Sequence, residues 1–366
     1  MAKIVVYVNS LAKGGAERVA VNLANYFHES GFESVLVTSR VFEDEYPQPE
    51  GVRRIVAEEE QGEIKNRAAY FWKRFRGIRA VWKKERPDLI VSFIGKVNFM
   101  ALMTTFGMRI PVVVSVRSDP HKEYPSKLMR LLSKTLYLRA KGVIVQTPDA
   151  KQYFPGYMQK KVTILPNSLN PRFMRPRFEG KRRNEIVSVG RLDPNKNQQM
   201  LIHAFANIAD DFPDMQLVLY GDGLPENSTR GALEELSRVL GLQSRIRFMG
   251  RRNDVEQQIY ESRIYVLTSN IEGMPNALLE AMSLGLACIS TDCPCGGPRT
   301  VIRDGENGLL VPVGDIAALE QALRRILSDP GLEERLGVNA SAIQKDLAPE
   351  RVNQMWMDYI APFMKA

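Results

Sequence analysis

Short apolar runs alternate with segments of helical periodicity along the whole chain. Runs rich in Val, Ile and Leu are typical of strands buried on both faces of a parallel sheet. We expect strands at residues 4–8, 35–38, 88–94, 112–116, 142–147 and 162–167, then at 186–190, 216–220, 246–250, 263–268, 287–291 and 307–311. Amphipathic segments follow many of these runs. The pattern predicts an α/β protein with parallel sheets and helices on both sheet faces.

The length of 366 residues favours two domains rather than one core. A segment rich in proline and basic residues, 170–184, is the predicted linker. We therefore expect domains at 1–170 and 171–350, with an amphipathic tail, 351–366, that crosses back to the first domain. No apolar run approaches 18 residues, so the sequence predicts no transmembrane helix.

The stretch 269–282 has the strongest chemical content. It follows a predicted strand and leads into a helix, whose first turn suits Pro275. Such a junction directs backbone N–H groups and the positive end of a helix dipole into one crevice. Glu272 and Glu280 flank that end, and carboxylates accept hydrogen bonds from sugar hydroxyls. A sugar nucleotide carries both phosphates and hydroxyls, so it fits both the positive helix end and the two carboxylates.

Two further strand ends have polar or glycine-rich continuations. Arg191 and Lys196 bracket a turn after the strand that ends at Gly190, and two cations there can clamp a diphosphate. Gly14 and Gly15 stand between the first strand and a helix, where glycine permits φ > 0 and close approach of a ligand. The Gly-x-Gly-x-x-Gly fingerprint of nicotinamide binding is absent from this loop.

These motifs resemble the signatures of retaining glycosyltransferases of family 4, which have the GT-B fold. The resemblance rests on Glu-Gly-Met-Pro-Asn-Ala-Leu-Leu-Glu-Ala at 272–281, Gly-Arg-Leu-x-x-x-Lys-Asn at 190–197 and Gly-Gly-Ala-Glu-Arg at 14–18. The motifs occur in the family's order over essentially the whole chain. The resemblance implies two Rossmann-like domains facing a cleft, the first for the acceptor and the second for the donor.

The implied reaction transfers a hexose or N-acetylhexosamine from a nucleoside diphosphate sugar, for which we expect UDP as the nucleotide, with retention of anomeric configuration. Arg191 and Lys196 would hold the diphosphate, Glu272 the sugar and Glu280 the ribose hydroxyls. No Asp-x-Asp is present to hold a metal, and neither a metal nor a cofactor is expected. Other substrate-binding residues would be Gly14, Gly15, Glu17, Ser118, Gly221, Gly250, Val255, Gly273, Met274, Pro275 and Asn276.

One position departs from the family pattern. Members commonly have a histidine after the strand that corresponds to 112–116, near the reacting sugar. Arg117 occupies that place here, and His121 follows four residues later. Arg117 is therefore the catalytic candidate, with Ser118 beside it, and His121 is interpreted as a surface-loop residue. The sequence leaves open which of Arg117 and His121 contributes to the chemistry.

The charge is unevenly distributed. The net charge is +8, but residues 1–180 contain 30 basic and 17 acidic residues and the remainder contains 20 and 25. Nine basic residues fall within 63–86, interspersed with apolar ones, and residues 126–139 have the same character. Basic amphipathic helices bind anionic membranes. We expect a cytoplasmic protein, peripheral on the inner face of the cell membrane, with a saccharide acceptor linked to polyprenyl diphosphate.

Other functions remain open at this point. A sugar-nucleotide epimerase of related fold would bind the same donor but need no acceptor. A non-catalytic sugar-nucleotide or nucleic-acid binder is a different class, although no nucleic-acid motif accompanies the basic charge. Cys288, Cys293 and Cys295 are expected to be thiols in a reducing compartment. A metal site at Cys293–Cys295 is disfavoured because no histidine or fourth thiol lies near.

Overall fold

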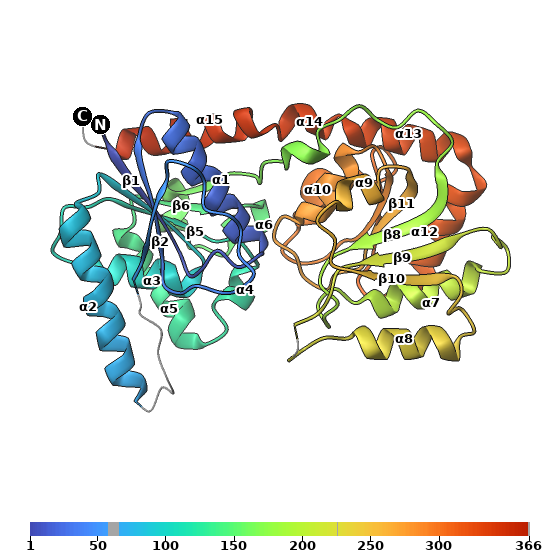
Figure 1. The fold of residues 1–366 in the computed structure, drawn as a ribbon, viewed down its shortest axis with the longest axis horizontal. Helices are drawn as coiled ribbons and strands as arrows, with labels where there is room; N and C mark the ends of the chain where they lie inside the picture. The colour runs from blue at the N-terminus through green and yellow to red at the C-terminus, as the bar shows by residue number, and fades with distance from the viewer. Residues whose placement is uncertain (58–65, 225, 365–366) are drawn as a thin grey trace. The chain divides into compact units, whose positions relative to one another are not determined.

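The computed structural model describes residues 1–57, 66–224 and 226–364 (Figure 1). The chain forms two compact units: Met1–Asn167 together with the residues from Glu350 onward, and Ser168–Pro349. Each unit is built on a parallel sheet with helices packed against it. The predicted fold class, α/β with two Rossmann-like parts, is confirmed.

The first unit has a seven-stranded sheet of order β3-β2-β1-β4-β5-β6-β7, in which every pair is parallel. Its strands are β1 (Lys3–Val8), β2 (Glu33–Thr38), β3 (Arg53–Val56), β4 (Leu89–Phe93), β5 (Val112–Ser115), β6 (Gly142–Val145) and β7 (Val162–Ile164). Strand order reverses between β1 and β4. Such a reversal opens a crevice at the carboxyl ends of the two strands.

The first unit has seven α-helices in its described part. They are α1 (Gly15–Glu29), α2 (Arg67–Glu85), α3 (Gly95–Thr104), α4 (Pro120–Glu123), α5 (Lys127–Thr135), α6 (Pro148–Gln152) and α15 (Pro349–Ile360). Although α15 is remote in sequence, it packs on this unit. Trp356 is buried with its ring centroid 6.0 Å from that of Phe93, and the Tyr359 hydroxyl donates to the Lys161 carbonyl at 3.1 Å.

Strand β3 is absent from the sequence prediction. It pairs with β2 at the sheet edge and begins with two arginines instead of an apolar run. Charged contacts hold it in place: Arg53 binds Glu85, and Arg54 binds Glu45 with its Nη1 2.6 Å from Oε2. Periodicity cannot reveal a strand of this kind, because ion pairs with carboxylates outside the strand hold it, rather than an apolar face packed on the core.

Helix α2 covers most of the basic segment and is buried only toward its carboxyl-terminal end. Its buried apolar residues are Ile78 and Trp82. Trp72 is 55% exposed, and the amino-terminal half of the helix extends beyond the sheet (Figure 1). Glu63 and Lys65, at the start of the predicted basic segment, lie outside the described residues.

The second unit has a six-stranded parallel sheet of order β10-β9-β8-β11-β12-β13. Its strands are β8 (Arg183–Val189), β9 (Gln216–Tyr220), β10 (Ile246–Gly250), β11 (Ser262–Leu267), β12 (Ala287–Thr291) and β13 (Leu309–Val311). Here the order reverses between the neighbouring strands β8 and β11. The carboxyl ends of these two strands are therefore the expected place for a ligand.

Helices pack on both faces of the second sheet. They are α7 (Gln198–Ile208), α8 (Arg230–Val239), α9 (Val255–Gln258), α10 (Asn276–Ser283), α11 (Gly297–Val301), α12 (Ile316–Ser328), α13 (Pro330–Ser341) and α14 (Ile343–Asp346). Alternate side chains of β11 point to opposite faces of the sheet and belong to two different hydrophobic clusters. Ile264 and Val266 pack with α7 and α12, whereas Tyr265 and Leu267 pack with α10. Burial on both faces explains why these strands are continuous apolar runs.

Candidate active site

The β8–α7 turn places two cations at the carboxyl end of a central strand. The Asp193 carboxylate accepts hydrogen bonds from the backbone N–H groups of Asn195 and Lys196, at 3.0 and 3.1 Å. Its second oxygen lies 3.2 Å from Arg191 Nε. Asp193 therefore fixes both the shape of the turn and the direction of Arg191. The Arg191 side chain is 57% exposed, whereas that of Lys196 is only 18% exposed.

The β11–α10 loop brings Glu272 to Lys196. The Lys196 Nζ lies 2.5 Å from Glu272 Oε1, and the Ser269 hydroxyl donates to the same oxygen at 2.6 Å. Glu272 is 13% exposed and Ser269 is fully buried. An ammonium and a hydroxyl thus both donate to one carboxylate oxygen in a largely enclosed position.

Backbone hydrogen bonds join the two loops directly. The Asn270 N–H donates to the Asn195 carbonyl at 2.8 Å, and the Thr268 hydroxyl donates to the Lys196 carbonyl at 2.9 Å. Because β8 and β11 are neighbours, loops that are more than 70 residues apart in sequence become one surface. The predicted grouping of Arg191, Lys196 and Glu272 is thereby brought together within the second unit.

A third loop holds the main chain of Glu272. Its N–H donates to the Pro294 carbonyl at 2.7 Å, and its carbonyl accepts from the Cys295 N–H at 2.8 Å. Close by, a Cβ on Gly297 would lie 1.5 Å from the Gly273 carbonyl oxygen, so only glycine fits at that position. The carboxylate of Glu272 therefore projects from a rigid backbone.

Helix α10 begins directly after this loop. Pro275 is its N-cap residue, and no side chain there caps the first turn. The first turn therefore presents its positive end beside Glu272. Glu280 lies about one turn inside the helix and is buried, as are Gly273 and Met274.

The neighbouring strand ends are joined by glycines. The Gly190 N–H donates to the Tyr220 carbonyl at 2.9 Å, and the Gly221 N–H donates to Gly250 at 2.8 Å. Gly221 has φ +126°, and a Cβ there would lie 2.0 Å from the Gly190 carbonyl oxygen. Gly250 ends β10, and Val255 begins α9 after a short loop. These candidates lie at the same sheet edge as Arg191.

In the first unit, Gly14 and Gly15 do precede a helix, but φ > 0 is not the reason for the paired glycines. Gly14 has φ −130°, and Gly15 is the first residue of α1. A Cβ on Gly14 would instead lie 2.4 Å from Glu17 Oε2. The glycine leaves room for the Glu17 carboxylate to fold back over the start of the helix.

Arg117 follows β5 and is held by residues of its own unit. Its guanidinium binds Asn167 Oδ1, lies 3.4 Å from the Ser115 hydroxyl and sits 5.7 Å from the Phe93 ring centroid. Burial lowers the pKa of Arg117 to about 10. The Arg117 N–H donates to Glu123 Oε2 at 3.2 Å. Burial raises the pKa of Glu123 to about 7, although backbone N–H groups of Arg117, Ser118 and Gly95 oppose that rise.

His121 lies on the exposed side of this segment. Its backbone N–H donates to Asp119 Oδ1 at 2.8 Å, and its ring meets Tyr153 edge-on at 5.1 Å between centroids. It is located in the single turn of α4. The part predicted as a surface loop is thus a capped helical turn, with the imidazole outside the buried network around Glu123.

Comparison with known proteins identifies the family. A family model described as Glycosyltransferase Family 4 matches residues 13–173, and one described as Glycosyl transferases group 1 matches residues 171–342. The two matches adjoin and include every candidate residue named above. The chain belongs to glycosyltransferase family 4.

Relatives of this glycosyltransferase are similar over its whole length. It is 27% identical, over all of both chains, to a Campylobacter jejuni α-1,4-N-acetyl-D-galactosaminyltransferase named for GalNAc-α-(1→4)-GalNAc-α-(1→3)-diNAcBac-PP-undecaprenol. A second C. jejuni enzyme, a 4-α-N-acetylgalactosaminyltransferase named for an N,N′-diacetylbacillosaminyl-diphospho-undecaprenol saccharide, is 26% identical over 91% of this chain and 92% of the relative. Anabaena HepE in complex with UDP superposes with a TM-score of 0.84 at 18% identity, over 99% and 100% of the two chains. This likeness shows the GT-B fold.

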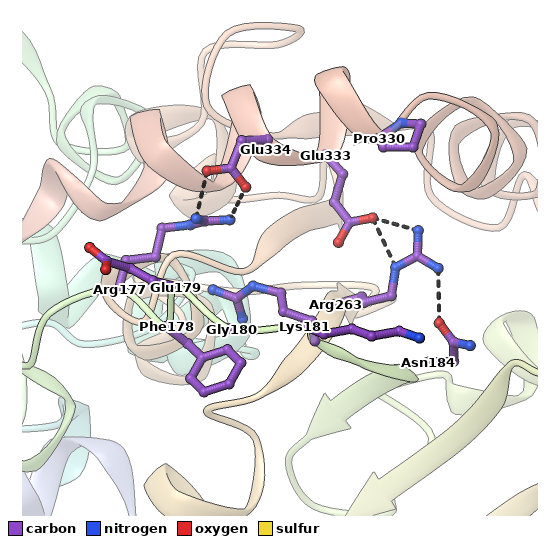
Figure 2. A pocket seen from close by; sticks show the side chains of 11 residues that line it. Arg177, Phe178, Glu179, Gly180, Lys181, Asn184, Arg263, Pro330, Glu333 and Glu334 are labelled. Carbon is purple, nitrogen blue, oxygen red and sulfur yellow. Dashed lines mark hydrogen bonds and ion pairs between the residues drawn. The ribbon is translucent and has the colours of Figure 1, made fainter.

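A cavity of about 550 Å³ in the glycosyltransferase lies away from these loops (Figure 2). Its lining comes from residues 177–182, from the start of α13 and from the amino-terminal ends of β8 and β11. These strand ends are at the opposite edge of the sheet from Arg191. Most of its charges already face each other: Arg177 binds Glu334 at 2.7 Å through both nitrogens, and Arg263 binds Glu333 at 2.6 Å. The cavity is therefore not the candidate active site.

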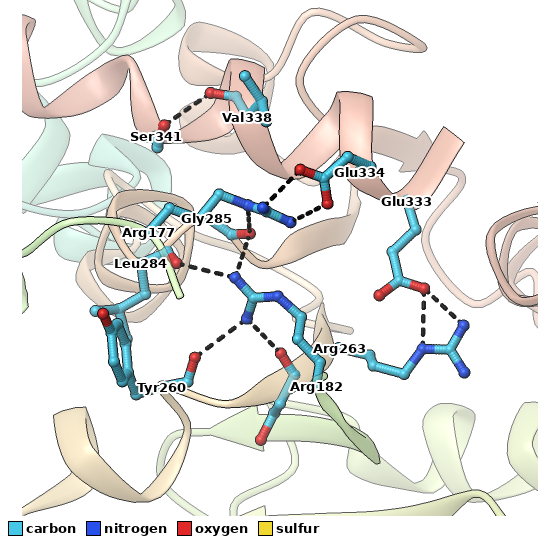
Figure 3. A network of polar contacts seen from close by, with 11 residues as sticks. Arg177, Arg182, Tyr260, Arg263, Leu284, Gly285, Glu333, Glu334, Val338 and Ser341 are labelled. Carbon is cyan, nitrogen blue, oxygen red and sulfur yellow. Dashed lines mark hydrogen bonds and ion pairs between the residues drawn. The ribbon is translucent and has the colours of Figure 1, made fainter. Parts of the chain in front are cut away.

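The same region fixes the segment that enters the second unit (Figure 3). Arg182 donates to the carbonyls of Tyr260, Ser262 and Gly285 at 3.1, 2.7 and 3.1 Å. Burial lowers the pKa of Arg182 to about 10, and the neighbouring Arg177 adds to the effect. These contacts hold the carboxyl end of α10 and the start of β11, the two elements whose other ends form the site.

Three residues of the glycosyltransferase are missing from the sequence prediction. Asp193 could be found from the sequence, because an aspartate commonly accepts hydrogen bonds from the backbone N–H groups two and three residues later in a turn. Ser269 and Glu123 could not be found in this way, since a buried serine and a carboxylate in a polar segment look ordinary without their partners. Their roles depend on contacts that periodicity does not encode.

The three cysteines are all free and buried. Burial raises the pKa of the Cys293 thiol to about 12. Across residues 1–57, 66–224 and 226–364, no group of three or more His, Cys, Asp or Glu side chains is arranged to hold a metal ion.

Proposed function

We propose that this protein is a retaining glycosyltransferase that moves a hexose or N-acetylhexosamine from a UDP-linked donor to a lipid-linked saccharide, in envelope polysaccharide or glycan assembly. The observation that carries the donor half is the joining of Arg191, Lys196 and Glu272 beside the start of α10. Cations and a helix N-terminus suit a diphosphate, and a carboxylate suits sugar hydroxyls. The HepE complex with UDP supports the choice of nucleotide.

We assign the stabilisation of the charges that develop during the transfer to groups of the protein itself. As the sugar departs, negative charge develops on the diphosphate, and preorganised cations stabilise it without reorganisation. Arg191, Lys196 and the first turn of α10 would do this, so we propose that the transfer is metal-independent. Glu272 would hold the sugar hydroxyls while positive charge develops on the ring, and Glu280 would hold the ribose.

The acceptor follows from the relatives. Two of them, which match this chain over nearly their whole lengths, are named for saccharides on undecaprenyl diphosphate. We propose an acceptor of that class for the first unit, where residues 14–17 at the start of α1 and the Arg117–Ser118 loop follow strands of one parallel sheet. Arg117 would contact the reacting saccharide in place of the family's histidine.

An acceptor in a membrane requires the enzyme to reach the bilayer surface. Within the described ranges no helix is both long and apolar enough to cross a bilayer. Two helices of the first unit instead expose apolar side chains among basic ones: Trp72 on α2, and Leu128 on α5, which is 64% exposed. We propose peripheral contact with the anionic inner face of the cell membrane through these helices.

Arg191→Ala tests the assigned chemistry. We expect the variant to lower kcat by roughly 10²-fold or more, as losses of preorganised charge stabilisation do. The assay measures product formation from a panel of nucleotide sugars with polyprenyl-diphosphate saccharides, with and without a chelator, and NMR of the product gives the anomeric configuration. Arg238→Ala, which removes an exposed arginine from the last turn of α8, should behave as wild type.

A near-native rate for Arg191→Ala would refute its role. Formation of an epimerised nucleotide sugar without any acceptor would show that the protein is an epimerase rather than a transferase. Nucleotide binding with no product from any acceptor would indicate a binding protein.

A further inference from the structure

Lys196 and Glu272 form an ion pair with each other within the candidate site. The Nζ–Oε1 distance is 2.5 Å, and both side chains are largely enclosed. The proposed function gives these two residues different ligands, the diphosphate for Lys196 and the sugar for Glu272. A donor diphosphate that binds Lys196 must therefore displace the Glu272 carboxylate.

Both main chains are fixed, so the pair can change only through its side chains. The Lys196 N–H and carbonyl bind Asp193 and Thr268, and the Glu272 N–H and carbonyl bind Pro294 and Cys295. Ser269 adds a hydroxyl that holds the carboxylate toward Lys196. An enclosed charge left without its partner is strongly unfavourable, so each member needs a new partner when the pair separates.

We propose that Glu272 is a specificity-determining residue that acts as an internal substitute for the donor diphosphate. The incoming diphosphate forms an ion pair with Lys196, and the Glu272 carboxylate then accepts hydrogen bonds from other donors. Sugar hydroxyls supply such donors, whereas a nucleoside diphosphate without its sugar leaves the carboxylate unpaired beside phosphate. The exchange rests on the proposed function, and it makes the site favour the intact donor over the diphosphate product.

The test compares UDP and UDP-N-acetylgalactosamine by isothermal titration calorimetry. Glu272→Gln removes the competing charge, so we expect it to bind UDP about tenfold tighter than wild type. The gain for the sugar nucleotide should be smaller, because the variant also loses the carboxylate that holds the sugar. The preference for sugar nucleotide over UDP should therefore fall several-fold.

Two further variants make the result specific. Ser269→Ala leaves every charge in place and loosens the hold on Glu272, so UDP should bind a few-fold tighter; this variant also serves if Glu272→Gln fails to fold. Glu333→Gln is the matched control, since it removes a carboxylate from an equally enclosed ion pair with Arg263 at the opposite sheet edge (Figure 2). Its UDP affinity should equal that of wild type.

Equal or weaker UDP binding by both Glu272→Gln and Ser269→Ala would overturn the exchange while leaving the proposed function intact. A gain in Glu333→Gln as large as in Glu272→Gln would also overturn it, because net charge would then explain the effect. If the wild-type protein binds neither UDP nor the sugar nucleotide, the exchange and the assignment of the site fall together.

Discussion

Glu85, the last residue of α2, holds the edge of the first sheet. Its buried carboxylate lies 3.0 Å from Arg53 Nη1 on β3 and 3.2 Å from Lys3 Nζ on β1. The hydrogen bond from Arg53 lowers the pKa of Glu85 to about 2, and Lys3 adds to the effect against the cost of burial. One carboxylate thus connects three elements that have no other sequence signal for their association.

The first prediction concerns the pH dependence of this contact. The pKa of Glu85 is lower in the folded protein than its ordinary value of 4.5, so its contribution is complete above pH 4.5 and disappears as the pH falls toward 2. Glu85→Gln should destabilise the first unit at pH 7 by about 3 kcal/mol, the usual cost of breaking a buried pair. Urea unfolding from pH 7 to pH 3 should show the difference from wild type shrinking.

A surface pair provides the comparison. Glu235→Gln removes a carboxylate that meets Arg238 at the surface of α8, and it should leave the urea midpoint nearly unchanged at every pH. A Glu85→Gln defect that stays constant across the pH range would contradict the ionic origin of the effect.

At the scale of elements, strand ends are joined closely enough to require particular glycines. Gly221 combines φ +126° with a carbonyl oxygen 2.0 Å from the position of a Cβ. It thereby connects the ends of β8 and β9 beside the turn that holds Arg191 and Lys196. Sequence shows only a glycine after a strand, which is a common and ambiguous sign.

Gly221→Ala should therefore destabilise the second unit by about 3 kcal/mol, since strain of this kind costs about 1–3 kcal/mol and a steric clash adds to it. Gly231→Ala is the matched control: it lies in α8 with nothing within 4 Å of its Cβ position, and it should raise stability by up to about 1 kcal/mol. Thermal unfolding measures both. A Gly221→Ala protein as stable as wild type would show that the strand ends can separate freely.

At the scale of the whole molecule, the charge is divided between the two units. The basic first 180 residues include an aromatic cluster of Phe71, Trp72 and Phe75, whose neighbouring ring centroids lie 5.5–6.4 Å apart. Phe71 and Trp72 are exposed. Anionic lipid attracts basic residues by about 1 kcal/mol each near the surface. Aromatic rings among basic residues are suited to the interface between headgroups and acyl chains.

We therefore expect the protein to co-sediment with anionic liposomes and much less with neutral ones. The double variant Phe71→Ser/Trp72→Ser should lower the anionic fraction roughly tenfold, because two interfacial rings are lost. Val239→Ser, at a position that is 68% exposed on α8 of the second unit, should leave it unchanged. Equal recovery on neutral and anionic vesicles would rule out electrostatic docking through the first unit.

The sequence by itself determined the two parallel sheets and most of their strands, and it singled out the main polar residues of the candidate site. Buried strands and their following loops are local features, and the spacing between Glu272 and Glu280 or Arg191 and Lys196 lies within one loop or turn. Local periodicity and motif spacing are sufficient for such features. They also indicated that the strand ends, rather than the helices, carry the chemistry.

Only the tertiary structure decided which of these residues touch. Lys196 and Glu272 are 76 residues apart and meet because β8 and β11 are neighbours, an order that no local pattern contains. The same reason explains why β3 escaped prediction, since it is held by β2 and by Glu85, which is 32 residues away. Asp193, Ser269 and Glu123 bond to residues close to them in the chain, but sheet order and packing decide that these polar residues, among many similar ones, lie beside the candidate site residues.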